Sequence, residues 1–226
     1  MPRSLWKGSI SFGLVNIPVV LYSAENRNSF DLTLLDRRDM KPVGFKRYNK
    51  ETGKEVAWDH IVKGYEYENS RYVVLTDEDF RRANVEATQT IDILSFVRAE
   101  DISPTSFETP YYLAPDGNVA AEAFAVMREG MAGKAAIGKL ALYGREYLVA
   151  IQPRENGLVM YTLRHASEVR AMGSIDELAT VPAKIKPDEI KLARQVISNF
   201  ETEGDLTQYK DDYQTELRKI IEAKIA

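Results

Sequence analysis

The sequence contains no cysteine and only two histidines, His60 and His165, among its 226 residues. The absence of cysteine excludes disulfides, thiolate zinc sites and cysteine nucleophiles, and it suits a reducing compartment. Long apolar runs are also missing, because no stretch approaches the ~20 residues that a membrane span needs. The first residues lack the apolar core of a signal peptide. We therefore expect a folded cytoplasmic protein that contacts no membrane.

An excess of positive charge is lacking too. The net charge of -4 and the pI near 5.4 exclude a uniformly basic nucleic-acid binder. The charge is unevenly distributed, however. Between Arg37 and Lys54, seven basic residues stand against two acidic ones, whereas between Asp188 and Ala226 six basic residues stand against nine acidic ones. A local excess of +5 can attract a polyanion, although a solvated hairpin is the commoner origin of such a charge run.

The first two-thirds of the sequence has the pattern of short strands. Ile10, Phe12 and Leu14 alternate with small residues, and the alternation resumes after Pro18. This pattern predicts one strand interrupted at Pro18 or two short strands, with the three apolar residues in the core. Further strands are predicted, mostly as hairpins, at residues 43–48, 55–58, 65–68, 71–75, 91–97, 111–114, 137–143, 146–152 and 158–164. Consecutive hairpins favour an antiparallel sheet or barrel over a parallel α/β fold.

Four helices are expected. Thr76 precedes three acidic residues and predicts a helix N-cap, with the helix ending near Asn84. An alanine-rich helix over 119–131 presents an apolar stripe for the core, made of Phe124, Met127 and Met131. Two amphipathic helices, over 187–200 and from about 211, form an appended arm whose apolar stripes must pack on the barrel or on a partner chain.

No set of residues converges on a reaction. The segment Gly133–Leu140 matches a phosphate-binding P-loop up to its last position, where Leu140 replaces the Ser or Thr that reaches magnesium. Its expected context of helix, glycine turn and strand is also wrong for a P-loop. An NTPase would need ATP turnover that is lost on Lys139→Ala. His60 is expected to be a surface residue or a satisfied core residue, and not a general base.

The strand tyrosines could stack on bases, but aromatic residues are also common strand residues that pack on cross-strand neighbours, and we expect the latter. These tyrosines are Tyr65, Tyr67, Tyr72, Tyr111 and Tyr112. The basic stretch itself suits phosphates more than bases. Alternation places Lys46 and Arg47 on opposite faces of the predicted hairpin.

The segment Leu5–Val19 closely resembles the opening of the bacterial Ku family. Four further segments resemble this family in the same order, namely Arg38–Pro42, Asn49–Val56, Ile61–Tyr67 and Tyr111–Leu113. The resemblance spans essentially the whole chain.

The resemblance implies a mainly β fold with α, a Ku-type antiparallel β-barrel with an inserted bridge and a C-terminal helical arm. We assign residues 1–173 to the barrel core with its DNA-encircling bridge, the basic hairpin to about 37–64, and residues 174–226 to the arm. The lysine-rich tail of many family members is absent up to Ala226. Two copies would form a ring through which a double-stranded DNA end is threaded. The ring would protect the end and recruit the multifunctional ATP-dependent ligase of non-homologous end joining.

On this interpretation the protein is not an enzyme, needs no cofactor and acts at DNA breaks in the nucleoid. Some family members hold cysteines around the bridge, and their absence here predicts that no metal is bound. The residues expected to contact DNA phosphates are Arg37, Lys46, Arg47, Lys50, Lys54, Lys134, Lys139 and Arg145. The alternative is a barrel that serves as a single-strand nucleic-acid-binding or protein-interaction module.

Overall fold

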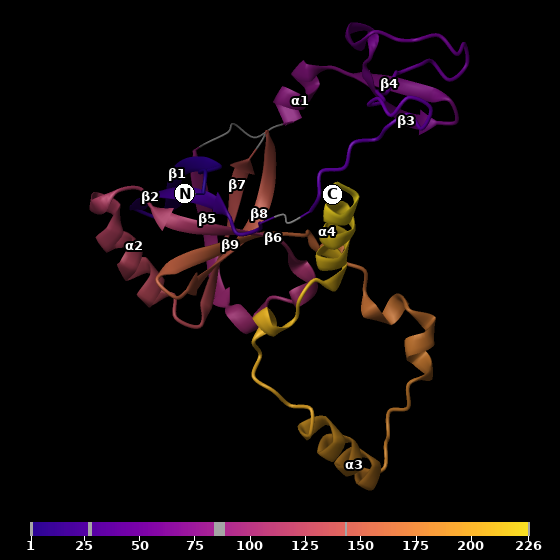
Figure 1. Ribbon diagram of the computed structural model, residues 1–226. Coiled ribbons are helices and arrows are strands. Elements are labelled where there is room, and N and C mark those ends of the chain that lie inside the picture. Colours follow the sequence, from indigo (N-terminus) through magenta and orange to yellow (C-terminus); the bar gives the residue numbers. More distant parts are fainter. Residues whose placement is uncertain (1, 27–28, 84–88, 143, 226) are drawn as a thin grey trace. The chain divides into compact units, whose positions relative to one another are not determined.

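The computed structural model describes residues 2–26, 29–83, 89–142 and 144–225 (Figure 1). The chain divides into two compact units. One unit consists of Met1–Arg27 with Leu32–Val169, and the other of Asn28–Asp31 with Arg170–Ala226.

Seven strands of the first unit form a closed barrel in the order β1-β2-β6-β9-β8-β7-β5 (Figure 1). Their bounds are β1 Trp6–Phe12, β2 Val15–Ser23, β5 Thr90–Arg98, β6 Phe107–Pro115, β7 Lys134–Leu142, β8 Arg145–Arg154 and β9 Gly157–Leu163. The predicted mainly β fold with a barrel is therefore confirmed. One pairing differs from the expected antiparallel pattern, because β1 and β5 run parallel where they close the barrel.

The first two strands form a tight hairpin, and its turn does not lie where the sequence pattern indicated. The chain reverses at Gly13 and Leu14, and Gly13 adopts the positive φ of 56° that this type of turn requires at its first central position. Leu14 therefore lies fully exposed at the turn, so its predicted place in the core is wrong. Pro18 lies within β2, next to the end of the ladder between β2 and β6, which begins at Val19. The missing N–H of the proline consequently interrupts no ladder hydrogen bond with β6.

The barrel is filled by inward-facing aliphatic residues from every strand, and Ile10 and Ile91 on the parallel pair are completely buried. Fully buried side chains of this kind account for most of the hydrophobic stabilisation of such a fold. Strands β5 and β7 approach each other closely at Gly138, where an added Cβ would lie 2.7 Å from the carbonyl oxygen of Asp92. Large aliphatic side chains thus fill the barrel, and the missing side chain of Gly138 lets β5 and β7 lie close together.

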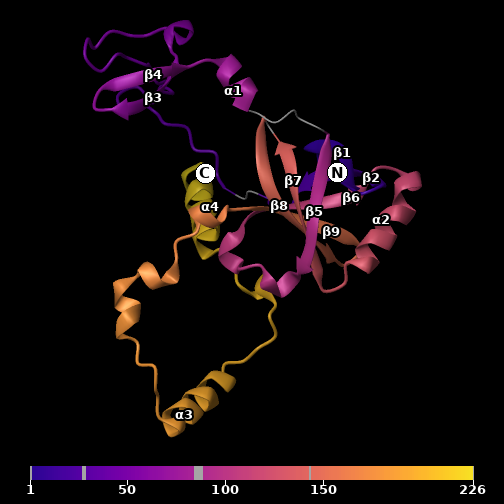
Figure 2. The ribbon, with the colours of Figure 1, turned by 180° about the vertical axis from the view of Figure 1, so that it is seen from behind.

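Helix α2 (Asn118–Gly130) lies along the outside of the barrel (Figures 1 and 2). Phe124, Met127 and Met131 are buried and belong to the same core cluster as the barrel strands. The predicted apolar stripe of this helix is therefore confirmed. The helix ends before Gly133, whose φ of +71° allows the chain to enter β7 directly.

Between β2 and β5 the chain forms a second, two-stranded sheet of β3 (Lys63–Glu68) and β4 (Arg71–Leu75), followed by α1 (Asp77–Ala83). This hairpin is confirmed. Thr76 caps α1 as predicted: its hydroxyl accepts the Asp79 N–H at 3.2 Å, and the Asp79 carboxylate accepts the Thr76 N–H at 2.8 Å. The Thr76 hydroxyl also donates to the Asp79 carboxylate at 2.7 Å, and this bond, together with the one from the Thr76 N–H, lowers the pKa of the Asp79 carboxyl. The expected ends of α1 at Asn84 and of β7 at Tyr143 lie outside the described residues.

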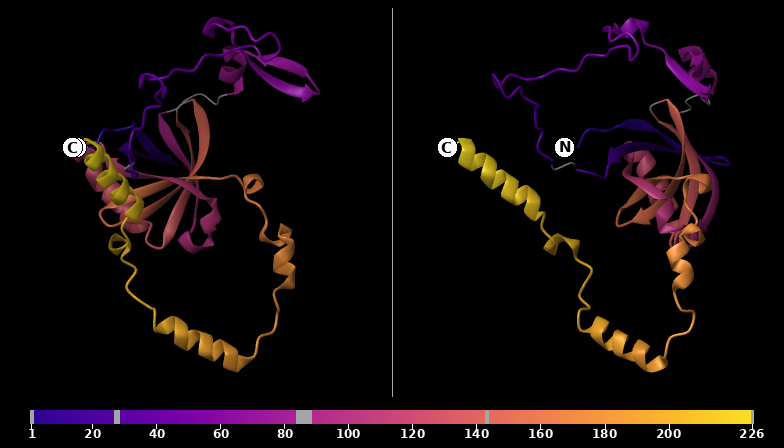
Figure 3. Two further views of the ribbon diagram at one scale, coloured as in Figure 1. Left: turned by 45° about the vertical axis from the view of Figure 1, so that its right-hand side comes forward. Right: turned by 90° about the vertical axis from the view of Figure 1, so that its right-hand side faces the viewer.

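The second unit contains α3 (Pro187–Ser198) and α4 (Asp212–Ile225), joined by a connection with one short 3-10 turn (Figure 3). Both predicted amphipathic helices are present. No described residue of this unit is buried, and Val196, Ile197 and Phe200 are at least half exposed. The Arg218 guanidinium of α4 lies 5.2 Å from the ring centroid of Phe30, in the short stretch of this unit that precedes the second sheet in the sequence.

Candidate nucleic-acid interface

The most positively charged part of the chain lies in residues 32–83, which we call the bridge segment. All of these residues are described, and none of them is buried. Only Asp36, Val56 and Leu75 are even half-buried. A segment without a core of its own depends on local hydrogen bonds and on side-chain pairs for its shape.

The first turn of the bridge segment is held by Asp36. Its backbone N–H donates to the carbonyl of Lys41 at 2.8 Å, and its carboxylate accepts from the Arg38 guanidinium at 2.6 Å. This bond and a second one from the Arg38 backbone N–H, at 2.9 Å, lower the pKa of the Asp36 carboxyl. Arg38 is thereby paired with a neighbouring carboxylate, whereas Arg37 is exposed and forms no ion pair with a described residue.

The second turn covers residues 45–58, and from here on the name basic hairpin is used for these residues alone instead of for about 37–64. It contains less strand than the sequence predicted. The strands expected at 43–48 and 55–58 are absent, and one isolated bridge between Tyr48 and Glu55 takes their place. The Asn49 N–H donates to the carbonyl of Lys54 at 2.8 Å, and the Asn49 side-chain oxygen accepts two further backbone N–H groups. Gly53 supplies the positive φ of 66° that closes the turn.

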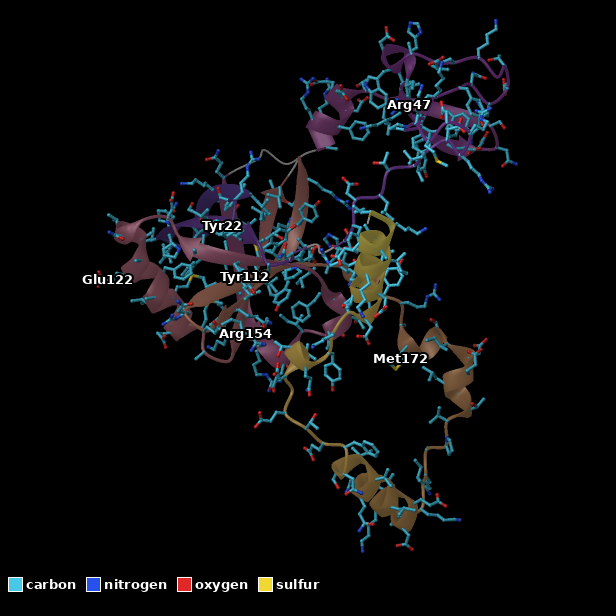
Figure 4. All side chains as sticks on the ribbon, viewed as in Figure 1. Tyr22, Arg47, Tyr112, Glu122, Arg154 and Met172 are labelled. Carbon is cyan, nitrogen blue, oxygen red and sulfur yellow. The ribbon has the colours of Figure 1, made fainter. Side chains whose placement is uncertain are left out.

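The two neighbouring cations of the basic hairpin have different partners. The Lys46 ammonium lies 2.8 Å from the Glu55 carboxylate. The Arg47 guanidinium lies instead over the indole of Trp58, 4.2 Å from the ring centroid (Figure 4 labels Arg47). The Val56 N–H donates to the carbonyl of Arg47 at 2.9 Å, so Trp58 is the diagonal cross-strand neighbour of Arg47. Arg47 keeps its full charge, because an aromatic ring does not neutralise it.

The eight residues predicted to contact phosphates therefore fall into two groups. Among the described residues, two of them form ion pairs, Lys46 with Glu55 and Lys139 with Glu146 at 2.8 Å. The other six have no carboxylate partner within the described chain: Arg37, Arg47, Lys50, Lys54, Lys134 and Arg145.

The structure gathers Lys46, Arg47, Lys50 and Lys54 on one hairpin, and it separates the predicted barrel residues. Lys134 begins β7, whereas Arg145 begins β8 opposite the other end of β7 and lies 5.6 Å from the Tyr147 ring centroid. The barrel residues therefore form no single cluster, whereas the basic hairpin does.

Aromatic partners of these cations were missed in the sequence. Besides Trp58 with Arg47, the Lys63 ammonium lies 4.5 Å from the Phe80 ring centroid. The sequence predicted the hairpin but not its register, and only the observed pairing of Tyr48 with Glu55 places Trp58 diagonally opposite Arg47.

The expectation that the strand tyrosines pack on cross-strand neighbours stays a prediction for most of the bridge segment, where Tyr67 of β3 contacts the Arg71 guanidinium of β4. Tyr65, Tyr67 and Tyr72 are each more than half exposed, since no second layer covers the sheet of β3 and β4. On the barrel, Tyr111 packs against the core, whereas Tyr112 is exposed.

The P-loop resemblance is not matched by the geometry. Gly133 lies between the end of α2 and the start of β7, the reverse of the strand-to-helix order of a P-loop, and Lys139 is bound to Glu146. Within the described ranges, no group of three or more His, Asp or Glu side chains is placed to hold a metal ion. None of the helices in the described part of the chain combines the length and the apolar character of a membrane span.

The family model for the Ku70/Ku80 beta-barrel domain matches residues 11–192 of this chain. A relative from Cupriavidus necator, named non-homologous end joining protein Ku, is 45% identical over 230 residues, which cover 100% of this chain and 68% of the relative. A protein of the same name from Pseudomonas aeruginosa is 40% identical over 229 residues, covering 100% of this chain and 78% of the relative. Another from Archaeoglobus fulgidus is 34% identical over 226 residues, covering 99% of this chain and 88% of that protein.

Proposed function

The chain belongs to the Ku family, and from this premise we propose that it binds the ends of double-stranded DNA, without regard to sequence, in non-homologous end joining. Its relatives carry the name of that process. In this proposal the protein catalyses no reaction itself. It protects the end and brings a multifunctional ATP-dependent DNA ligase to it.

The observation that carries the proposal is the set of uncompensated cations on the basic hairpin. Arg47, Lys50 and Lys54 have no carboxylate partner in the described chain, although the chain as a whole has a net charge of -4. Positive charge concentrated on one hairpin of an acidic protein attracts phosphates and leaves the remaining surface repulsive to DNA.

The same hairpin offers little that could read a base sequence. Bidentate recognition of adenine requires a free amide of Asn or Gln, and the Asn49 side-chain oxygen already accepts the N–H groups of Glu51 and Thr52. Lysine and arginine side chains that bind phosphates position the protein but carry no sequence information. We therefore propose that the hairpin contacts phosphates and not base edges, so that binding is independent of sequence.

The ring is the part of the proposal that needs a second copy. The proposed arm, residues 174–226, has no buried residue in its described part, and Ile190 and Val196 of α3 and Phe200 just beyond its end are exposed. Amphipathic helices are stabilised mainly by burying their apolar face, so a partner surface is expected for them. We propose that a second copy supplies it, and that two barrel cores (residues 1–173) with their bridges enclose the DNA.

The test compares linear duplex with covalently closed circular duplex of the same sequence and length in a gel-shift experiment, with the oligomeric mass measured in parallel. The proposal predicts binding to linear duplex, poor binding to the circle and a mass of two chains. Equal binding to both forms would contradict end binding. A preference for an unstructured oligonucleotide, or no affinity for nucleic acid, would instead support the single-strand-binding or protein-interaction module.

A further inference from the structure

Trp58 of the bridge segment is a large aromatic side chain that has almost nothing of its own chain to pack on. Its relative exposure is 70%, and no residue of the bridge segment is buried. An indole buries a large apolar area when it finds a partner, and it loses that stabilisation when it stays in water. The position therefore calls for a ligand that brings an apolar or aromatic surface.

The surroundings of Trp58 indicate which ligand fits. The Arg47 guanidinium covers one face of the indole at 4.2 Å, and Lys50 and Lys54 follow on the same hairpin without carboxylate partners in the described chain. An open aromatic face beside several free cations is the combination that binds single-stranded nucleic acid. The ring stacks on a base, and the cations bind the backbone.

The backbone holds this combination in place. The His60 N–H donates to the carbonyl of Ala57 at 3.1 Å and the Ile61 N–H to the carbonyl of Trp58 at 3.1 Å, which fixes a 3-10 turn over Trp58–His60. The bond between Val56 and Arg47 fixes the opposite side of the pair. The stacking surface is consequently preformed, and little ordering is needed when a base binds.

The other cation–aromatic pairs of the bridge segment fit a base less well. The Arg71 guanidinium lies farther from its ring, at 5.3 Å from the Tyr67 centroid, and its charge is compensated by Glu68 at 2.7 Å. The ring of Phe80, which contacts Lys63, is 41% exposed, against 70% for Trp58. Of these three pairs, Trp58 has the most exposed aromatic side chain, and its cation, Arg47, has no carboxylate partner among the described residues.

We propose that Trp58, backed by Arg47, stacks on an unpaired base of a single-stranded overhang next to the duplex end. This inference rests on the proposed function and deepens it. The cations bind the phosphates of every end, and Trp58 adds affinity only where an unpaired base is present. Stacking tolerates all four bases, so the preference is for overhangs as such.

The experiment measures the affinity of the full chain for three DNA ends that share one duplex: a blunt end, an end with a three-nucleotide overhang, and the same overhang without its bases. The abasic overhang keeps the phosphates and removes the stacking partner. We expect wild-type protein to bind the normal overhang about 5- to 150-fold more tightly than the abasic one. Because this comparison needs no substitution, it holds even if a variant fails to fold.

Variants then assign the effect to the indole. Trp58→Ala should reduce the affinity for the normal overhang to that for the abasic one and leave blunt-end affinity within about twofold, while Trp58→Phe should restore most of the preference. Tyr72→Ala, which removes another exposed aromatic residue of the bridge segment, should keep the full preference. Arg47→Gln should weaken binding to all three ends.

Equal wild-type affinity for normal and abasic overhangs would overturn the inference, and so would a Trp58→Ala variant that binds all ends equally weakly. A loss of the two-chain mass in Trp58→Ala would also overturn it, because the indole would then belong to a protein contact. If wild-type protein fails to bind even the blunt duplex, the proposed function itself fails, and this outcome is distinguishable from the others.

Discussion

The basic hairpin should account for much of the salt dependence of DNA binding. The perturbation is the triple substitution of Arg47, Lys50 and Lys54 by glutamine, which removes three charges that have no carboxylate partner in the described chain. In a homodimer six charges are lost. Each phosphate contact contributes about -0.9 to the slope of log K against log salt, so the slope should flatten by about 5.

The magnitude follows from counterion release. With six contacts, a rise from about 50 to 200 mM salt weakens binding roughly 10³-fold, and the triple variant should lose that part of the salt sensitivity. The assay is fluorescence anisotropy of labelled blunt duplex at five salt concentrations, repeated with a second, unrelated sequence. Both sequences should weaken alike, because phosphate contacts carry no sequence information.

The matched control neutralises three lysines of the second unit that are exposed and have no ion pair in the described chain: Lys184, Lys191 and Lys210. Its slope should equal that of the wild type, and both variants should keep the wild-type mass. An unchanged slope in the triple variant, with the fold intact, would refute the assignment of phosphate contacts to the basic hairpin.

Three further outcomes are expected. Glu55→Gln should strengthen binding to duplex about two- to fivefold in the same assay, because it frees Lys46 from an exposed ion pair of modest strength; weaker binding would contradict this. Gly138→Ala should destabilise the barrel by about 1–3 kcal/mol in urea unfolding, because its Cβ would press on the β5 backbone, whereas Gly173→Ala, whose Cβ meets open space, should change stability by less than about 0.5 kcal/mol. The pKa of the Asp36 carboxyl is lowered in the folded state, so this group contributes stability above its unfolded pKa of about 3.9, and that stability is lost as the pH falls through the folded pKa. The turn around Asp36 should therefore give unchanged NMR signals between about pH 8 and pH 5. Loss of the turn near pH 6 would contradict this expectation.

The strands of the barrel were predictable because their signal is local. Alternating apolar residues such as Ile10 and Phe12 mark the inward face of a strand wherever that strand pairs. The position of the first turn could not be predicted in the same way, because a proline usually indicates that a strand is interrupted. Pro18 is tolerated within β2 because the ladder between β2 and β6 begins one residue later, at Val19. The parallel pairing of β1 with β5 joins distant parts of the chain and leaves no pattern in either segment.

The candidate site, too, could be predicted from the sequence only in part. The concentration of positive charge on the basic hairpin follows from counting residues. The division of the predicted phosphate-binding residues into free and paired cations does not, because Glu55 on the hairpin and Glu146 on the barrel each neutralise one lysine through contacts that depend on strand register. Trp58 lies outside the basic stretch, and only the pairing of residue 47 with residue 56 brings it to Arg47.

The most direct test of the central claim, that a homodimeric ring encloses the DNA, is a trapping measurement. Protein is loaded on linear duplex, the DNA ends are joined by a purified ligase, and the closed circles are washed at about 1 M salt, where phosphate contacts are screened. The ring predicts that protein stays on the circles through the wash and is released when one restriction cut opens them. Protein that washes off circles as readily as off linear duplex would contradict the enclosure of DNA.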